Sequence, residues 1–256
     1  MNFWLGQFHI FLLVMLRVST LLIVAPIFGH RNYLARAKVG LAFMVSLLIF
    51  PLVAHADLQV PEGVFPYAFM MIREAAMGLV LGFAVLLVFI GIQFAGQLIG
   101  LQMGFGIVNV IDPQSSDQIS IMGQFLNILA ILLLLSLNGH HMILRALMHS
   151  FEVVPLGQVV IKAPVMAKLM VLSAQVFVIG TKIAAPVVVS LFLVSVALGI
   201  LARTVPQMNV FIVGFPVQIG VGLATLMMTL PLFFVLLQRL LHSMERDLFA
   251  LLAFMH

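Results

Sequence analysis

The chain has 256 residues, of which 64% are hydrophobic and 8% are charged, whereas soluble globular domains are roughly 45–50% apolar and about 25% charged. The formal net charge of +4 is spread thinly over the loops, which excludes the basic cluster that nucleic acid requires. The absence of cysteine excludes disulfides and thiolate metal sites. Polar side chains cannot cover so much apolar surface, so the composition predicts an integral membrane chain or a subunit of a membrane complex.

Apolar runs of uneven length follow one another along the chain. The second and fourth lie at or below the roughly 17–25 residues that a helix needs to cross hydrocarbon. The fifth would make a rod of about 54 Å at 1.5 Å per residue, and Pro186 within it predicts a kink or a division. Conventional counting predicts six spans: Phe3–Phe28, Val39–Ala54, Ala75–Leu101, Ile121–Leu137, Met166–Leu201 and Val210–Leu237.

Loop charges follow the positive-inside rule only at the start of the chain. The first loop is basic, with Arg36 and Lys38, and the second contains Asp57 and no positive charge. By alternation the loop at 102–120 should then be cytoplasmic, yet it has no lysine or arginine. Either one run is a hairpin or these helices do not sit in lipid as ordinary spans.

Four charged residues lie in or at the ends of these runs: Arg17, Arg73, Glu74 and Lys182. A charge at the centre of a span costs roughly 2.5–3.5 kcal/mol on insertion scales, so we expect Arg17 and Lys182 to be buried against protein. The functional interpretation is a polar route or a fixed intersubunit ion pair. Near a helix end, a long basic side chain can instead extend its charged group to a polar interface, and this interpretation is favoured for Arg73. Both Glu74 and Glu152 remain candidate partners.

Five glycines recur mostly at intervals of four along the third run, at Gly78, Gly82, Gly96, Gly100 and Gly104. Small residues four apart share a helix face and let another backbone approach closely. The repeated spacing favours a tightly packed helix interface over simple helical flexibility.

The segment at about 104–120 combines turn-forming residues with apolar side chains. Glycine and the residue before proline disfavour helix, and irregular backbone between apolar helices is tolerated where protein buries it or where it lines a wet cavity. The segment is thus a candidate plug or constriction, although a re-entrant connector fits these residues about as well. The candidate plug residues are Phe105, Gly106, Ile107, Val108, Asn109, Val110, Ile111, Asp112 and Pro113.

A metal site is the first hypothesis raised by His141, Arg145 and His149, which share one helical face. An arginine between two histidines repels a cation, and no carboxylate lies at ligand spacing, so we expect a glycine turn that starts an interfacial helix. No nucleophile, zinc-protease, phosphate-binding or dinucleotide motif is present. The sequence predicts no metal, no cofactor and no enzyme activity.

Two long helices are predicted after about residue 161, joined by a polar turn with Arg203, Pro206, Gln207 and Asn209. The tail at 238–256 keeps a helical apolar rhythm beside charged residues, a pattern that suits a cytoplasmic partner or the membrane surface. Near residue 161 the sequence changes from short apolar runs joined by substantial loops to two long helices. This change predicts two parts, 1–160 and 161–256.

Six strings stand out along the chain: Arg17–Ser19, Arg73–Phe83, Gly104–Gly106 with the following residues to Gln114, Leu137–His141, Arg203–Phe211 and Gly214–Pro216. Taken in order, they resemble the FliR family of flagellar export-gate subunits, which are related to the SctT subunits of virulence type III secretion systems. The likeness runs nearly end to end, and the strings are specific in combination. Ser195 is a departure, since many relatives carry Asp or Asn there.

The resemblance implies an all-α, membrane-associated subunit packed with FliP and FliQ in a hetero-oligomeric gate. Residues 1–160 would be FliP-like and residues 161–256 a FliQ-like hairpin with its tail. The segment at 104–120 would occlude the channel through which unfolded flagellar proteins cross the bacterial inner membrane, at the flagellar basal body. FlhB is a further expected partner. The alternative is a secondary transporter of a small solute, with Arg17 and Lys182 at a midplane site.

Overall fold

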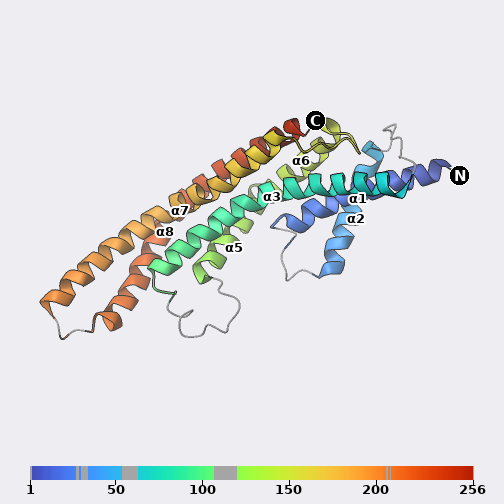
Figure 1. Ribbon diagram of the computed structural model, residues 1–256. Coiled ribbons are helices and arrows are strands. Elements are labelled where there is room, and N and C mark those ends of the chain that lie inside the picture. Colours follow the sequence, from blue (N-terminus) through green and yellow to red (C-terminus); the bar gives the residue numbers. More distant parts are fainter. Residues whose placement is uncertain are drawn as a thin grey trace. The chain divides into compact units, whose positions relative to one another are not determined.

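The computed structural model describes residues 2–26, 29, 34–53, 63–106, 120–205, 207 and 209–255. Within these ranges all regular structure is helical, which confirms the all-α class (Figure 1). The seven helices of the described chain are α1 (Asn2–Val24), α2 (Ala35–Val53), α3 (Val64–Gln102), α5 (Ile121–Ser136), α6 (Gly139–Val153), α7 (Ala163–Thr204) and α8 (Val210–Phe254).

Five of the described helices, α1, α2, α3, α7 and α8, are long and apolar enough to cross a membrane. The helices α5 and α6 add a sixth candidate if they count as one span, bent by 70° at the break between them. The 16 residues of α5 are too few for a straight crossing of about 30 Å of hydrocarbon. The predicted count of six therefore depends on how this bent pair is treated.

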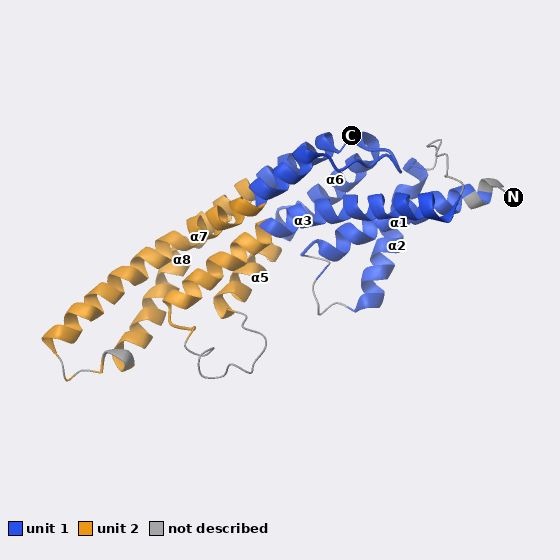
Figure 2. Ribbon diagram, in the orientation of Figure 1, with its two compact units in different colours: residues 1–87, 134–172, 241–256 blue, residues 88–133, 173–240 orange. Residues whose placement is uncertain are grey.

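The chain forms two compact units, each assembled from separate stretches of sequence (Figure 2). Unit 1 comprises residues 1–87, 134–172 and 241–256, and unit 2 comprises residues 88–133 and 173–240. Helices α3, α5, α7 and α8 contribute residues to both. The predicted division at residue 160 rests on a change in the pattern of apolar runs and on likeness to other subunits rather than on contacts, and it stays a prediction.

Unit 1 has a core of aliphatic side chains from α1, α3, α6 and the end of α8. Helices α1 and α3 run in the same direction, since the Tyr67 hydroxyl lies 3.5 Å from the His9 carbonyl oxygen and Gly82 lies against Val24 further along both helices. Fully or almost fully buried core residues are Leu13, Val14, Val18, Leu21, Met77, Leu81, Ile143, Leu147, Leu248, Leu251 and Leu252.

Unit 2 is built around the end of α3, which contacts α5, α7 and α8. Phe94 of α3 meets Phe177 of α7 edge to face, with ring centroids 5.4 Å apart. Helices α7 and α8 form an antiparallel hairpin joined by hydroxyl contacts, in which Ser190 Oγ donates to Thr225 Oγ1 at 3.1 Å. The predicted pair of long helices is therefore present.

The structure corrects two predictions about these long helices. Of the predicted kink or division at Pro186, the division is wrong, because α7 continues through Pro186 for 42 residues. A kink there stays a prediction. One proline removes a single backbone hydrogen bond, and the buried neighbours Ala184 and Val187 hold the helix together. The tail, in turn, does not offer its apolar stripe to a partner or to lipid. It continues α8, and Leu241, Leu248 and Leu252 are at most 1% exposed within unit 1.

Candidate functional site

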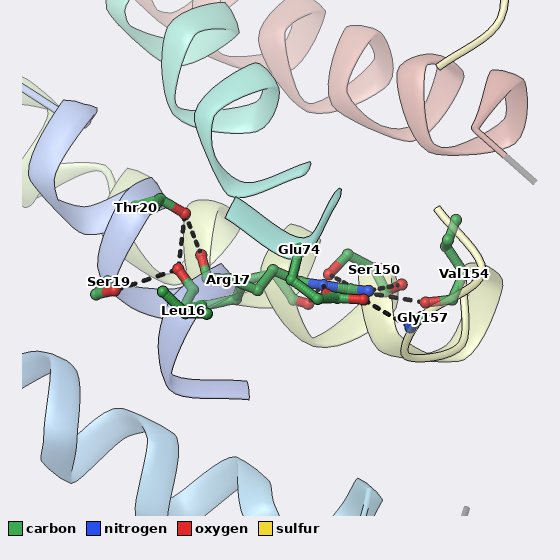
Figure 3. Close-up of polar contacts among 9 residues, drawn as sticks. Leu16, Arg17, Ser19, Thr20, Glu74, Ser150, Val154 and Gly157 are labelled. Atoms are coloured by element: carbon green, nitrogen blue, oxygen red, sulfur yellow. Dashed lines mark hydrogen bonds and ion pairs between the residues drawn. The ribbon is translucent and has the colours of Figure 1, made fainter. Parts of the chain in front are cut away.

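A buried ion pair joins α1 to α3 in unit 1 (Figure 3). Arg17 Nε donates to Glu74 Oε2 at 2.6 Å, and both side chains are fully excluded from solvent. Arg17 Nη1 also donates to the carbonyl oxygens of Ser150 and Val154, at 2.9 and 3.1 Å, and to Ser150 Oγ at 3.2 Å. Arg17 thus links α1 and α3 to the end of α6.

The same cluster is completed by contacts from two sides. The guanidinium carbon of Arg17 lies 4.4 Å from the centre of the Phe151 ring, a favourable cation–π distance. Glu74 Oε1 accepts a hydrogen bond from the Gly157 backbone N–H at 2.8 Å. A buried charge is tolerated when it is paired and hydrogen-bonded, and here both partners are. We call Arg17, Glu74, Ser150, Val154 and Gly157 the buried clamp.

The other charged candidates differ from Arg17 in their surroundings. Arg73 is half-buried and lies 4.4 Å from the centre of the Phe69 ring, so its head is not enclosed. Glu152 is exposed and accepts from His149 Nδ1 at 2.8 Å, which leaves Glu74 as the partner of Arg17. Lys182 is exposed on α7, so this chain alone does not bury it, and its burial by another subunit stays a prediction.

The five glycines of the third run lie at close helix contacts in both units. In unit 1, a Cβ atom on Gly78 would overlap Thr20 Oγ1 and the Arg17 carbonyl oxygen, and one on Gly82 would lie 2.9 Å from Val24 Cβ. In unit 2, a Cβ on Gly96 would lie 2.6 Å from the backbone nitrogen of Gly123. One on Gly100 would lie 2.6 Å from Ser120 Oγ. Glycine is what allows these backbones to approach.

Gly104 ends α3 in the left-handed conformation, with φ of +88°. The Phe105 N–H donates to the Gly100 carbonyl at 3.0 Å and the Gly104 N–H to the Leu101 carbonyl at 3.1 Å, which is the Schellman pattern for a helix end. Phe215 of α8 packs so closely that a Cβ on Gly104 would lie 2.8 Å from its ring. The start of the candidate plug segment is therefore fixed against α8.

Of the candidate plug residues, Phe105 and Gly106 are described and are half-buried. Residues Ile107 to Pro113 lie outside the described part of the chain. The helix that follows, α5, is capped by Ser120, whose Oγ accepts from the Gly123 N–H at 3.3 Å and donates to the Gly96 carbonyl at 3.2 Å.

The polar turn between α7 and α8 is exposed where it is described. Arg203 lies in the last turn of α7, and Gln207 and Asn209 follow it. Asn209 Oδ1 accepts from the Ile212 N–H at 3.3 Å, as a helix N-cap does. Pro206 lies outside the described residues.

The histidine region forms a turn at Asn138 and the helix α6 that follows it. Asn138 precedes α6 in the left-handed conformation, with φ of 56°. His149 stacks edge to face on Phe249 of α8, and Arg145 contacts Glu245 at 3.6 Å. Among the described residues no group of three or more histidine and carboxylate side chains could hold a metal ion.

Sequence reasoning did not find Ser150, Gly157 or Phe215. The first two act through backbone atoms or a small hydroxyl, and the third lies far along the chain from Gly104. Gly157 has a φ of +79°, and a Cβ there would lie 2.5 Å from Met70 Cε. In the sequence, the only sign of this role was that Gly157 lies outside the predicted helices, where a turn is expected.

Five long apolar helices and extensive exposed apolar surface are those of a multi-helix membrane protein. Residues 8–244 match the model of the family described as bacterial export proteins, family 1, and the chain belongs to that family.

Several curated relatives are flagellar biosynthetic proteins named FliR. The chain is 38% identical over 245 residues to that of Bacillus subtilis (strain 168), covering 93% of this chain and 92% of the relative. It is 31% identical over 229 residues to that of Escherichia coli (strain K12), covering 90% and 87%. It is 34% identical over 231 residues to that of Pectobacterium carotovorum subsp. carotovorum, covering 90% and 86%. All three relatives are named as flagellar biosynthetic proteins, and their names give no support to the small-solute transporter.

Proposed function

We propose that this chain is a non-catalytic subunit of the flagellar protein export gate in the bacterial inner membrane. The observation that carries the proposal is the family match over residues 8–244, together with 38% identity to a flagellar biosynthetic FliR protein. The gate would sit in the basal body and pass unfolded flagellar proteins. Energy would come from other export components, because the chain has no nucleotide-binding motif.

The partners proposed are FliP and FliQ, with FlhB at the cytoplasmic side. Residues 1–160 would take the place of a FliP-like subunit and residues 161–256 that of a FliQ-like hairpin. The apolar face of the hairpin supports this arrangement, since Phe192, Leu193 and Met228 are 60%, 62% and 82% exposed. Extensive exposed apolar surface on a pair of helices fits contact with protein or lipid.

The segment at about 104–120 would occlude the channel until a substrate engages. Apolar constrictions block ions partly by dewetting, so a small displacement of Phe105 to Ile111 could switch conductance. The Schellman end at Gly104 and the ring of Phe215 support this role, because a segment that moves needs a base that does not.

Assembly is tested by co-expression with FliP and FliQ, followed by native mass spectrometry in detergent. We expect a discrete complex that contains this chain. A stable chain that ignores both partners contradicts the proposal.

Occlusion is tested by deleting Ile107–Ile111. We expect the assembled complex to form at its normal yield, while cells leak ions and grow slowly. If the deletion abolishes the complex instead, the segment is structural and the plug role is wrong.

A further inference from the structure

The exposed apolar face of α7 is longer than a bilayer can cover. Large exposed apolar side chains lie in two stretches of it, residues 166–178 and 189–201. Met166, 50% exposed, and Leu201, 45% exposed, are about 52 Å apart along the helix, against about 30 Å of hydrocarbon. Lipid alone would cover both stretches only at a tilt of about 55°, beyond the observed range of roughly 0–40°. Part of this face is therefore left for protein to cover.

Lys182 lies near the middle of this face, about 24 Å from Met166 and about 28 Å from Leu201 along the helix. It lines an apolar pocket in unit 2 to which α5, α7 and α8 contribute. Pro186, one turn later, has no N–H to bond the Lys182 carbonyl. The pocket residues are Leu126, Lys182, Ile183, Pro186, Leu226, Thr229, Leu230, Leu232, Phe233 and Leu236.

The described residues offer Lys182 no counter-charge. The described carboxylates all belong to unit 1, and each already contacts a basic side chain. Lys182 makes no hydrogen bond or ion pair with any described residue. The engaged pairs are Glu74 with Arg17, Glu152 with His149, Glu245 with Arg145 and Asp247 with Lys168.

We propose that Lys182 is an intersubunit contact, at which an apolar helix of a second subunit covers α7 and places one Asp or Glu carboxylate against Nζ. This inference rests on the proposed function, because it requires a hetero-oligomer. A cation covered by apolar protein is tolerated only when a partner charge neutralises it. The occupant is therefore an apolar helix with a single acidic side chain level with Lys182, rather than a uniformly apolar one.

The experiment uses the wild-type complex purified with its co-expressed partners and dicyclohexylcarbodiimide, an apolar reagent that reaches groups in a membrane protein. It activates a carboxyl group, the Nζ amine attacks, an amide forms and dicyclohexylurea leaves. No spacer remains, so only groups already in contact are joined. The Lys168–Asp247 pair, 2.7 Å apart, is the internal positive control.

Mass spectrometry of the digested product decides between occupants. An amide between Lys182 and an Asp or Glu of another subunit supports the inference. A link to Asp112 or Asp117 of this chain overturns it, as does the absence of any Lys182 link when the control link forms. If Lys182 instead binds an anionic phospholipid that stays with the complex in native mass spectra, the occupant is lipid and the inference is wrong.

Variants give a second measure. We expect Lys182→Glu to lower the yield of complex by about 100-fold or more, as loss of a covered ion pair does, and Lys182→Arg to keep it within about twofold. Arg239→Met, at another exposed cation of unit 2, is the control and should leave the yield unchanged. A normal yield for Lys182→Glu overturns the inference alone, whereas failure of the wild type to form any complex overturns the proposed function.

Discussion

Replacing Arg17 by Met should be among the most destabilising single changes in unit 1. The change leaves Glu74 charged at 0% exposure, with only the Gly157 N–H still donating to it. It also leaves the carbonyl oxygens of Ser150 and Val154 without their Arg17 donor. Removing one partner of a buried pair costs about 3–5 kcal/mol, which is a factor of more than about 100 in the unfolding equilibrium.

The double variant Arg17→Met with Glu74→Leu separates charge from packing. Because it removes both charges, it should be more stable than Arg17→Met alone, by about 2 kcal/mol or more. The residual cost comes from the backbone groups that lose their partners, at about 1–3 kcal/mol for each group left buried and unpaired.

The assay is the fraction of protein that stays monodisperse in detergent after heating, measured by size-exclusion chromatography. Arg73→Met is the matched control: it removes an arginine next to Glu74, but one that is half-buried on the Phe69 ring, so a cost of about 0.5–1 kcal/mol is expected. If the double variant is less stable than both single variants, the instability of Arg17→Met does not come from an unpaired buried charge, and this explanation is refuted.

Further predictions concern glycines and a turn. Gly78→Val and Gly96→Val should each cost about 1–3 kcal/mol by forcing helices apart, whereas Gly199→Ala, with no atom within 4 Å of its added Cβ, should be neutral or stabilising in the same heating assay. Gly104→Ala should lower the stability of the folded chain by about 1–2 kcal/mol, because φ is +88°. Adding Phe215→Leu should restore only the part of this stability that is lost to the clash with the ring, and full restoration would show that the backbone is not strained. Asn138→Gly should keep the stability of unit 1, while Asn138→Val should lower its melting temperature, since φ there is 56°; equal melting temperatures would contradict this.

Much of the helix map could be predicted because apolar runs report directly on helices. The run Ile121–Leu137 corresponds to α5 at Ile121–Ser136, and the start of α8 at Val210 agrees with its run. The start of α3 was missed, because residues 64–74 are less uniformly apolar than the span that follows. The tail was predicted to be helical, but its continuity with α8 was missed because charged residues interrupt the apolar run. Hydropathy locates the apolar centre of a long helix better than its ends.

Helical spacing gives a residue's position along one helix but not the neighbouring helix. Arg17 is therefore conspicuous in the sequence, while its choice of Glu74 over Glu152 depends on a parallel α1–α3 contact separated by 57 residues. Ser150 and Val154, more than 130 residues away, contribute carbonyl oxygens, which every residue has. Such partners leave no signal in side-chain type, so this part of the clamp could not be read from the sequence.

The two units differ in how far their charged side chains are paired within this chain. Unit 1 contains every described carboxylate, and each contacts a basic side chain within that unit. Unit 2 is held by neutral contacts such as Ser190 with Thr225 and Gln218 with Ser195, and it keeps Lys182 without a described counter-ion. In the most apolar stretches of α7 and α8 only 22% and 17% of residues are buried, against 56% in α3. Lys182, Arg203 and Arg239 of unit 2 all lack a described counter-ion, and of these three only Lys182 lines an apolar pocket. A cation covered by apolar protein needs a partner charge, so Lys182 is the position at which we expect a partner carboxylate.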